Sequence, residues 1–485
     1  MIFSNINLTK DKAIYIQLKD HINNMISKGL VPNNSKLPSS RELSQILKIS
    51  RNSVVLAYEE LKSEGVIYSL YGKGTFVNSK NTFSNSSWSI NWDNLENTYS
   101  KTANELDIIK NEIPWKSDLI SFKSISPNGE LFDIEELKKS FLNRISLEGH
   151  KLLNYGYARG YKPLIDYLTV YMNNKGIDTT NKDILITNGF TEGFEILLSS
   201  FTETGSYILC ENPTHNTAIK IMKARGLNII TVDINKNGLD FNMLIEKLEK
   251  YKNKIKFSYI TPSYHNPTGT VMCPEDRYKF YNLMKKYNIA IIEDGFNEEL
   301  LYSSSHIFPI CSLDNLNNGV IYIGSFSKIL FPGMRIGWVL ADKKVIDKLE
   351  SVKRCKNIHV SFLDQGILYD YLVGGSFEKY IKKIRKFYGD KFNFAYNCVE
   401  KYIPNEYILG DGGLHLFIKL KNIDSRELLL RCYEKGVIFI PGDIFYIDDA
   451  GYDSLRLGFS RVPLDDLEIG VKIIGDIVNE MSKPS

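Results

Sequence analysis

The apolar positions of the first 80 residues repeat at helical spacing and then change to short β-type runs. Over residues 14–28 the apolar side chains stand three and four positions apart, which predicts an amphipathic helix. Ser39 followed by Glu42 is a capping-box pattern and predicts a second helix through Leu47, and Ser50 predicts the start of a third helix over 51–63. Because β-type runs at 66–69 and 75–77 follow around a glycine turn, we expect a helix-turn-helix with a two-stranded wing.

Beyond residue 117, helical patterns alternate with apolar β-type runs at 184–187, 206–210, 228–232, 256–261, 289–294 and 320–324. Apolar strands between helices predict a doubly wound, mainly parallel α/β sheet that helices cover on both faces. Residues 79–117 differ, because they are rich in Asn, Ser, Thr and Lys, lack a period, and predict a flexible linker with a helical stretch near 100–112. We therefore expect a DNA-binding part (1–78), the linker (79–117) and a third part (118–485), which divides into a large portion (about 150–360) and a small α+β portion (about 361–485 with 118–149).

The charges are unevenly divided along the chain. Residues 1–80 hold 11 Lys/Arg and 6 Asp/Glu, a net +5, so the rest of the chain carries −2 of the total +3. A basic excess confined to the helix-turn-helix favours a nucleic-acid partner. The six cysteines are scattered without a CxxC pair, which argues against a disulfide framework and a metal site. The N-terminus has no signal-peptide pattern and no apolar run reaches membrane length, so we expect a cytoplasmic, nucleoid-associated bacterial protein with no membrane partner.

The stretch SFSKILFPGMR holds the candidate reactive residue, Lys328. A lysine amine in such a setting forms a covalent imine with a carbonyl compound, and Ser325 and Arg335 around it suit a phosphate. Imine and phosphate together describe pyridoxal 5'-phosphate (PLP). Asp294 ends the apolar strand IAIIED, so its carboxylate is expected at the ligand-binding edge of the sheet, where it can hold the pyridine nitrogen.

Other residues complete this candidate site. Gly189, Phe190 and Thr191 form a strand–turn–helix junction, which suits a phosphate. Asn266 stands in an NPTG turn and presents an amide for a ring oxygen, and Arg456 in a β-type run suits a ligand carboxylate. Each of these signals alone is weak, but their order and spacing along the chain together indicate a PLP site.

The DNA-binding candidates lie at helix starts and on the wing. Arg51 at the start of the third helix suits a guanine edge, and Lys73 sits on the glycine-flanked wing tip. YIQLKDHI, LPSSRELS, ISRNSVVLAYEELKSEG and GKGTFV, within residues 15–77, closely resemble the GntR family of winged helix-turn-helix regulators. That resemblance implies operator binding by a dimer. The expected contacts are Ser39, Ser40, Arg41, Arg51, Asn52, Ser53 and Lys73.

The third part resembles the fold-type I PLP-dependent aminotransferases across about residues 118–480. The resemblance gives Lys328 the Schiff base, Asp294 the pyridine nitrogen and Asn266 the ring hydroxyl. It gives the phosphate to Ser325, Arg335 and the Gly189–Thr191 turn, and the ligand carboxylate to Arg456. Tyr155 would reach the phosphate of the neighbouring subunit. Two positions depart from the family pattern: Phe296 replaces a tyrosine and cannot donate to the ring oxygen, and His215 stands where an aromatic residue stacks on the ring.

The whole chain is similar to the MocR/GabR regulators, which implies a PLP-dependent transcription factor that binds a double-stranded DNA operator as a homodimer, often domain-swapped. We expect an amino-acid or amine effector to displace Lys328 by aldimine exchange, and the linker to pass the change to the DNA-binding part. PLP itself is a second candidate effector. We expect this regulatory domain to carry out at most partial or slow transamination. Two other interpretations stay open: an active aminotransferase with a fused DNA-binding domain, and a DNA-binding protein whose relict fold no longer holds PLP.

Overall fold

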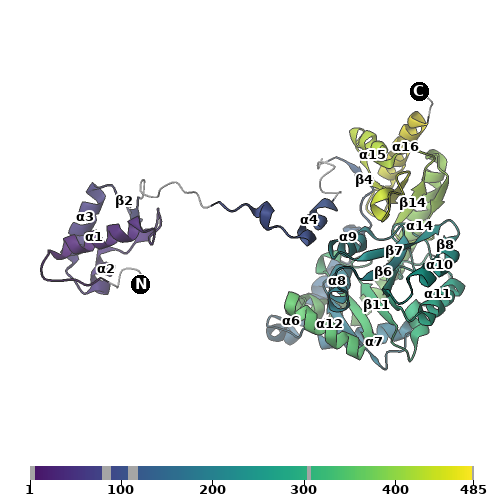
Figure 1. Ribbon diagram of the computed structural model, residues 1–485, viewed down its shortest axis with the longest axis horizontal. Helices are drawn as coiled ribbons and strands as arrows, with labels where there is room; N and C mark the ends of the chain where they lie inside the picture. Colours follow the sequence, from purple (N-terminus) through teal and green to yellow (C-terminus); the bar gives the residue numbers. More distant parts are fainter. Residues whose placement is uncertain (1–5, 79–88, 108–117, 303–306, 483–485) are drawn as a thin grey trace. The chain divides into compact units, whose positions relative to one another are not determined.

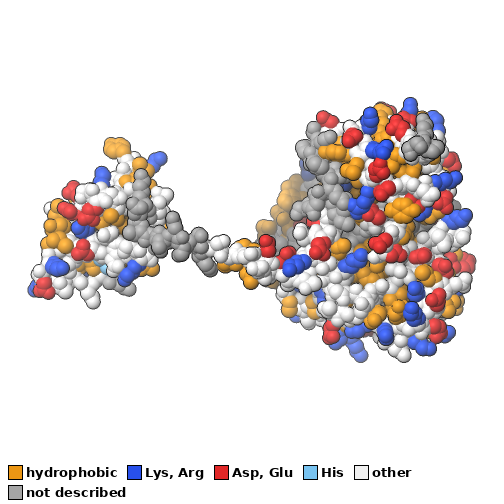
Figure 2. Space-filling model, turned by 45° about the horizontal axis from the view of Figure 1, so that its top comes forward, with side chains coloured by type: hydrophobic (Ala, Val, Ile, Leu, Met, Phe, Trp, Pro, Cys, Tyr) orange, Lys and Arg blue, Asp and Glu red, His pale blue; other side chains and the backbone are white. Residues whose placement is uncertain are grey.

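The computed structural model describes residues 6–78, 89–107, 118–302 and 307–482 and divides into two units, Met1–Leu95 and Glu96–Ser485 (Figure 1). None of the helices within these described ranges is long and apolar enough to cross a membrane. On the face of the larger unit that Figure 2 shows, side chains of both charges are interspersed.

The first unit is a winged helix-turn-helix, as predicted. Its three helices are α1 (Ile14–Ser27), α2 (Ser40–Leu47) and α3 (Arg51–Ser63), and its sheet has the order β1 (Lys36–Leu37), β3 (Gly74–Val77), β2 (Ile67–Leu70). The predicted capping box is present, since the Ser39 hydroxyl accepts from the Glu42 amide (3.2 Å) and the Glu42 carboxylate accepts from the Ser39 amide (2.8 Å). The predictions missed β1, which pairs with β3 but spans only two residues and so has no readable period. Leu18, Leu43, Val54 and Leu61 are fully buried between the helices and form this unit's core.

The larger unit is built on an eight-stranded, mainly parallel sheet, which confirms the predicted fold class. Its order is β5 (Lys182–Thr187), β12 (Gly337–Asp342), β11 (Val320–Ser325), β10 (Ala290–Asp294), β9 (Ile255–Ile260), β6 (Tyr207–Asn212), β7 (Asn228–Asn235) and β8 (Gly238–Leu239). All six predicted strands are present. The prediction did not include β12, which runs antiparallel between β11 and β5 because the chain turns back after the Lys328 loop.

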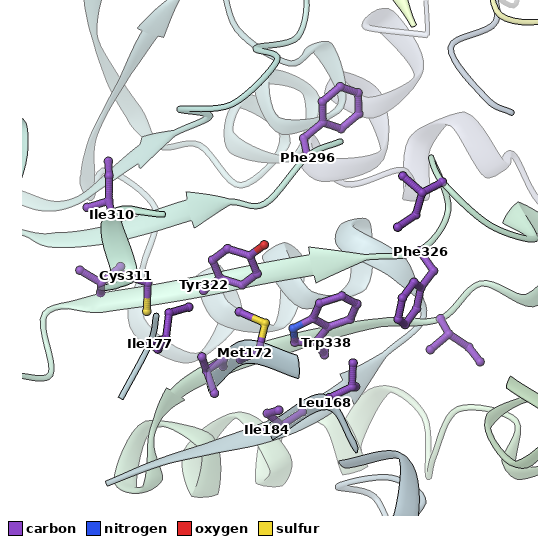
Figure 3. Packing of buried hydrophobic residues seen from close by; sticks show 14 of the residues in the cluster. Leu168, Met172, Ile177, Ile184, Phe296, Ile310, Cys311, Tyr322, Phe326 and Trp338 are labelled. Atoms are coloured by element: carbon purple, nitrogen blue, oxygen red, sulfur yellow. The ribbon is translucent and has the colours of Figure 1, made fainter. Parts of the chain in front are cut away.

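Alternate residues of each central strand enter two separate cores, because successive side chains of a strand point to opposite faces. Val320 and Tyr322 of β11 join one core, and Ile321 between them joins the other. Figure 3 shows the first core, in which Trp338 and Tyr322 from neighbouring strands pack against helix residues such as Leu168. The helices that enclose the sheet include α7 (Lys162–Asn174), α8 (Gly189–Phe201), α9 (Asn216–Ala224), α10 (Phe241–Tyr251), α11 (Pro274–Lys286), α12 (Lys343–Lys356) and α13 (Phe362–Val373).

The smaller part of this unit is an α+β layer with its own core. A four-stranded sheet has the order β13 (Tyr407–Leu409), β14 (His415–Lys419), β17 (Ser454–Gly458), β16 (Ile440–Pro441). A separate short pair, β4 (Ile120–Ser121) with β15 (Val437–Ile438), ties residues near 120 to this part. The surrounding helices are α14 (Ser376–Tyr402), α15 (Ser425–Glu434) and α16 (Leu464–Met481), whereas α6 (Ile134–Leu152) packs against α13 (Figure 1).

The predicted linker contains a helix, α4 (Thr98–Glu105), in place of the expected stretch near 100–112. Asn97 begins it, because its side chain accepts from the Ser100 amide at 2.9 Å. Residues 79–88 and 108–117 of the predicted linker lie outside the described residues, so its flexible parts stay a prediction.

Candidate functional site

A cavity of about 150 Å³ lies at the carboxyl ends of the central strands of the larger unit. Asp294 is the last residue of β10 and Ser325 the last of β11, and these two strands pair in parallel. Open α/β sheets bind ligands at this edge, because the loops that follow the strands converge there. The lining side chains are Phe190, Thr191, His215, Thr217, Asp294, Phe296, Asn297, Ser325, Ser327, Lys328 and Arg335.

Lys328 supplies the nucleophilic group of the cavity. It follows β11 directly and is largely enclosed by protein. Burial, followed by the positive charges of Arg456 and Arg335, lowers the pKa of its amine to about 8. A substantial fraction of the amine is therefore neutral near physiological pH, as attack on a carbonyl requires.

Asp294 supplies a carboxylate to the cavity that Lys328 lines. Its side chain is buried, and burial raises its pKa to about 7. The hydroxyl of Tyr259, on neighbouring β9, donates to Asp294 Oδ2 at 2.9 Å and favours the ionised form. A cationic ligand group beside this carboxylate would stabilise it further.

An anion cradle is formed where Arg335 meets the start of α8. Arg335 donates from Nη1 to Ser327 Oγ (3.0 Å) and from Nη2 to the Asn188 carbonyl (3.3 Å). Gly189, the first residue of α8, has φ +73°, and a Cβ there would lie 2.6 Å from Arg335 Nη2. Only glycine satisfies both constraints. The cradle therefore combines a guanidinium, serine hydroxyls and the amides of a helix N-terminus, which together suit a phosphate.

Arg456 is a buried residue in the middle of β17, an inner strand of the smaller sheet. It donates to Asn266 Oδ1 at 2.7 Å and to the Lys123 carbonyl at 3.2 Å, and its guanidinium lies 4.8 Å from the Phe445 ring centre. Burial lowers the pKa of Arg456 to about 9, and its buried Nε has no hydrogen-bond partner among the described residues. Because no carboxylate balances its charge in these contacts, Arg456 is suited to an anionic ligand group.

Neutral imidazoles line the same region. Burial lowers the pKa of His215 and of His415 to about 3, and the cations Lys328 and Arg456 add to the effect. The His215 ring centre lies 5.4 Å from that of Phe190 with the planes tilted by 48°, and the lowered pKa argues against a titrating role for His215. Phe296 packs near His415, with 6.4 Å between ring centres, and offers no donor to the cavity.

Most predicted site residues meet at this cavity. Gly189 lies against Arg335, which lines the cavity, and Asn266 accepts a hydrogen bond from Arg456. Tyr155 does not join them in this chain, because its side chain is 80% exposed on the surface. Sequence reasoning missed Tyr259, Thr217, Ser327 and Asn297. Ser327 stands inside the SFSK motif and Thr217 two residues after His215, so their positions carried a signal, whereas Tyr259 sits within an ordinary apolar strand.

The predicted DNA-binding residues gather at the starts of α2 and α3. Arg51 Nε lies 3.4 Å from Ser40 Oγ, which joins the two helix starts. Arg41, Arg51, Asn52 and, on the β2–β3 turn, Lys73 are exposed. Ser39 has its hydroxyl engaged in the capping box, so it presents less free hydrogen-bonding capacity than its sequence position suggested.

Comparison with known proteins places both units. "Aminotransferase class I and II" matches residues 125–474, and "Bacterial regulatory proteins, gntR family" matches residues 14–77. The chain belongs to the aminotransferase class I and II family. With its GntR-family domain it has the MocR-type organisation of an HTH-type transcriptional regulator.

Similar proteins include regulators and enzymes. The chain is 26% identical to the uncharacterized HTH-type transcriptional regulator YdfD of Bacillus subtilis, over 96% of this chain and 97% of that protein. It is 30% identical to aromatic-amino-acid aminotransferase 1 of Thermococcus litoralis, over 76% of this chain and 89% of the enzyme. Kynurenine aminotransferase of Pyrococcus horikoshii in complex with PMP superposes with a TM-score of 0.75 at 29% identity, covering 81% of this chain and 98% of that one.

Gly189→Ala should abolish the anion cradle. The added methyl would meet the Arg335 guanidinium, so we expect the affinity for inorganic phosphate, measured by isothermal titration calorimetry, to fall at least about tenfold. Gly375→Ala is the matched control, because Gly375 has φ +74° but open space around its Cβ. Both variants carry the same backbone strain of roughly 1–2 kcal/mol. Equal phosphate affinity in the two variants would contradict the assignment.

The Lys328 amine should become reactive well below its ordinary pKa of 10.5. We expect its rate of acetylation by acetic anhydride, followed by peptide mass spectrometry across a pH series, to rise with a midpoint near pH 8. Arg456→Gln removes one of the cations that lower this pKa, so it should move the midpoint upward. A midpoint at the ordinary lysine value in the unmodified chain would refute the enclosure of this amine.

Proposed function

We propose that this chain is a PLP-dependent transcriptional regulator, whose aminotransferase-like unit binds an amino-acid or amine effector and alters DNA binding by the winged helix-turn-helix. The proposal is carried by one observation. An enclosed amine, a buried carboxylate and a glycine-dependent anion cradle line one cavity in a chain that begins with a GntR-family domain.

The residues present fit PLP, because the cavity offers a complementary group for each of its polar parts. The cradle of Arg335, Ser325, Ser327 and the α8 N-terminus would hold the phosphate, Asp294 the ring nitrogen, and Lys328 the aldehyde carbon. PMP, present in the Pyrococcus horikoshii enzyme, is the aminated form of the same cofactor. Bound here, PLP would supply an electrophilic carbon to which primary amines add reversibly with loss of water.

The effector is expected to carry a primary amine and a carboxylate. Arg456 is buried with a free Nε edge and is positioned by Asn266, so it would orient an α-carboxylate beside Lys328. The neutral His215 would cover one face of the ring without competing for the anion. When its amine is free, Lys328 would be able to hold a proton on Nζ, which the charge of Asp294 favours. PLP alone remains a second candidate effector.

We also propose that the regulator is a homodimer. Large apolar side chains remain exposed along α6 and the loop after it, and a concentration of exposed apolar side chains supports an association site there. Tyr155 lies in this region and would reach the partner subunit's phosphate site. The exposed apolar side chains are Phe141, Leu142, Leu147, Leu153, Tyr155 and Tyr157.

A working aminotransferase is the second candidate function. The retained Lys328, Asp294 and Arg456 favour it, as does the 30% identity to aromatic-amino-acid aminotransferase 1. Phe296 argues against rapid turnover, because it cannot donate to the ring oxygen. Keto-acid-dependent turnover measured over a panel of amino acids separates the two functions.

Lys328→Ala should prevent covalent PLP attachment. We expect the visible absorbance of lysine-bound PLP, and the pyridoxyl-peptide obtained after borohydride reduction, to disappear, while DNA binding without ligand is kept. Lys343→Ala, at an exposed lysine on α12, should behave like the unmodified chain. A normal response of DNA binding to amino acids in Lys328→Ala would contradict the covalent mechanism.

Arg51→Ala should weaken and broaden DNA recognition. Loss of a two-pronged contact to a guanine edge costs about 1–3 kcal/mol, a decrease in affinity of roughly 5- to 150-fold for sites selected from a random DNA library. Lys62→Ala, in the last turn of the same helix, is the control and should have little effect. An equal loss on selected and random DNA would make Arg51 a phosphate contact instead.

A further inference from the structure

The linker helix α4 is docked on the larger unit, against α9, as Figure 1 shows. Tyr99, Ala103 and Leu106 stand four and three residues apart and face α9, whereas Lys101, Asn104 and Glu105 are exposed. Asp107, just after the helix, lies 3.5 Å from Lys220 of α9. The face of α4 that turns toward α9 is therefore the apolar one, and it is partly covered: Ala103 and Leu106 are half-buried and Tyr99 is 44% exposed.

The cavity beneath α4 adjoins the candidate PLP site. It measures about 390 Å³ and is lined by the apolar face of α4, by α9, and by Thr191 and Thr217. The same two threonines line the PLP cavity from its other side. Thr191 belongs to the anion cradle turn, and Thr217 lies in the first turn of α9, next to His215.

The segment that packs against Arg456, the residue expected to bind the effector carboxylate, also lines this cavity. Ile444, in the short 3-10 turn Gly442–Phe445, lines it together with α4. The next residue, Phe445, lies under the Arg456 guanidinium and accepts a hydrogen bond from the Thr214 amide at 2.8 Å. The cradle turn, through Thr191, and the segment that packs against Arg456, through Ile444, thus both line the cavity beneath α4.

We infer that α4 reads the occupancy of the site: ligand binding at the cradle and at Arg456 stabilises its docking on α9. This inference rests on the proposed function and adds the element that carries its signal. An eight-residue helix is marginal alone, so α4 keeps its helical form only while docked. In a helix each residue advances the chain by about 1.5 Å, and in an extended chain by up to about 3.3 Å. Undocking therefore lengthens the segment that leads to the DNA-binding unit.

The coupling must act in both directions. If the ligand favours the docked state, then disrupting docking must weaken ligand binding by the same factor. Typical couplings between sites are about 5- to 150-fold in affinity. This reciprocity lets a change on α4, which touches no ligand, be read out at the PLP site.

Ala103→Arg should break docking, because it places a positive charge among the apolar side chains of α4 and α9 and near Lys220. Asn104→Arg, the matched control, places the same group on the exposed face of α4. We expect the affinity of the full-length chain for PLP, titrated by absorbance, to fall at least about fivefold in Ala103→Arg and to stay unchanged in Asn104→Arg. Leu106→Asn should act in the same direction without adding charge. Equal PLP affinity in Ala103→Arg, Leu106→Asn and the control would overturn the inference.

Amide hydrogen exchange over residues 98–106 separates this inference from the proposed function. We expect PLP, and inorganic phosphate at higher concentration, to slow exchange in the unmodified chain and not in Ala103→Arg. Slowing by phosphate without any PLP binding would support the coupling and reject the proposed function. Bound PLP that leaves exchange unchanged would overturn the coupling alone. No PLP binding together with no effect of phosphate on exchange would overturn both.

Discussion

The site depends on the close approach of three backbone segments at one end of the sheet. Gly337 begins β12 beside Gly189, and a Cβ on Gly337 would lie 2.9 Å from the Gly189 Cα and 2.8 Å from the Gly324 carbonyl. A Cβ on Gly324 would enter the Trp338 ring. Because these positions exclude side chains, the loop between β11 and β12 returns tightly and brings both Lys328 and Arg335 to the start of α8. Amine and cradle are thus fixed by one steric constraint.

That arrangement gathers charged side chains in the protein interior, where they are shielded from solvent. Burial moves each pKa toward the neutral form, to about 8 for Lys328, about 9 for Arg456 and about 7 for Asp294. The cations outnumber the ionised acid, so an anionic ligand relieves the imbalance. A molecule with a phosphate and a carboxylate would place one anion beside each guanidinium, and this complementarity favours a ligand such as PLP joined to an amino acid.

The sequence predicted what depends on local pattern. Asp294 and Lys328 were found because a strand end and a distinctive motif mark them, and Ser39 because a capping box is readable within four residues. β12 was missed, since its position between β11 and β5 depends on the tight return at Gly337. Tyr259 was missed because its bond to Asp294 links residues 35 apart, and such pairing follows from strand order alone. The role of Tyr155 depends on a second chain and stays a prediction.

A free-standing aminotransferase has no need of a segment that covers α9, but a regulator must connect its ligand site to a distant domain. Here α9 begins beside His215 at the site, and its outer face holds the chain's own linker helix. Small shifts at a site are transmitted when a packed element has two discrete arrangements. The docked form of α4 and the released form that we propose would be such a pair, because a short helix that loses its apolar contacts also loses its helical form. The proposed slow chemistry and the proposed linker switch are therefore compatible, because a ligand that is turned over slowly would stay in the site longer and keep α4 docked.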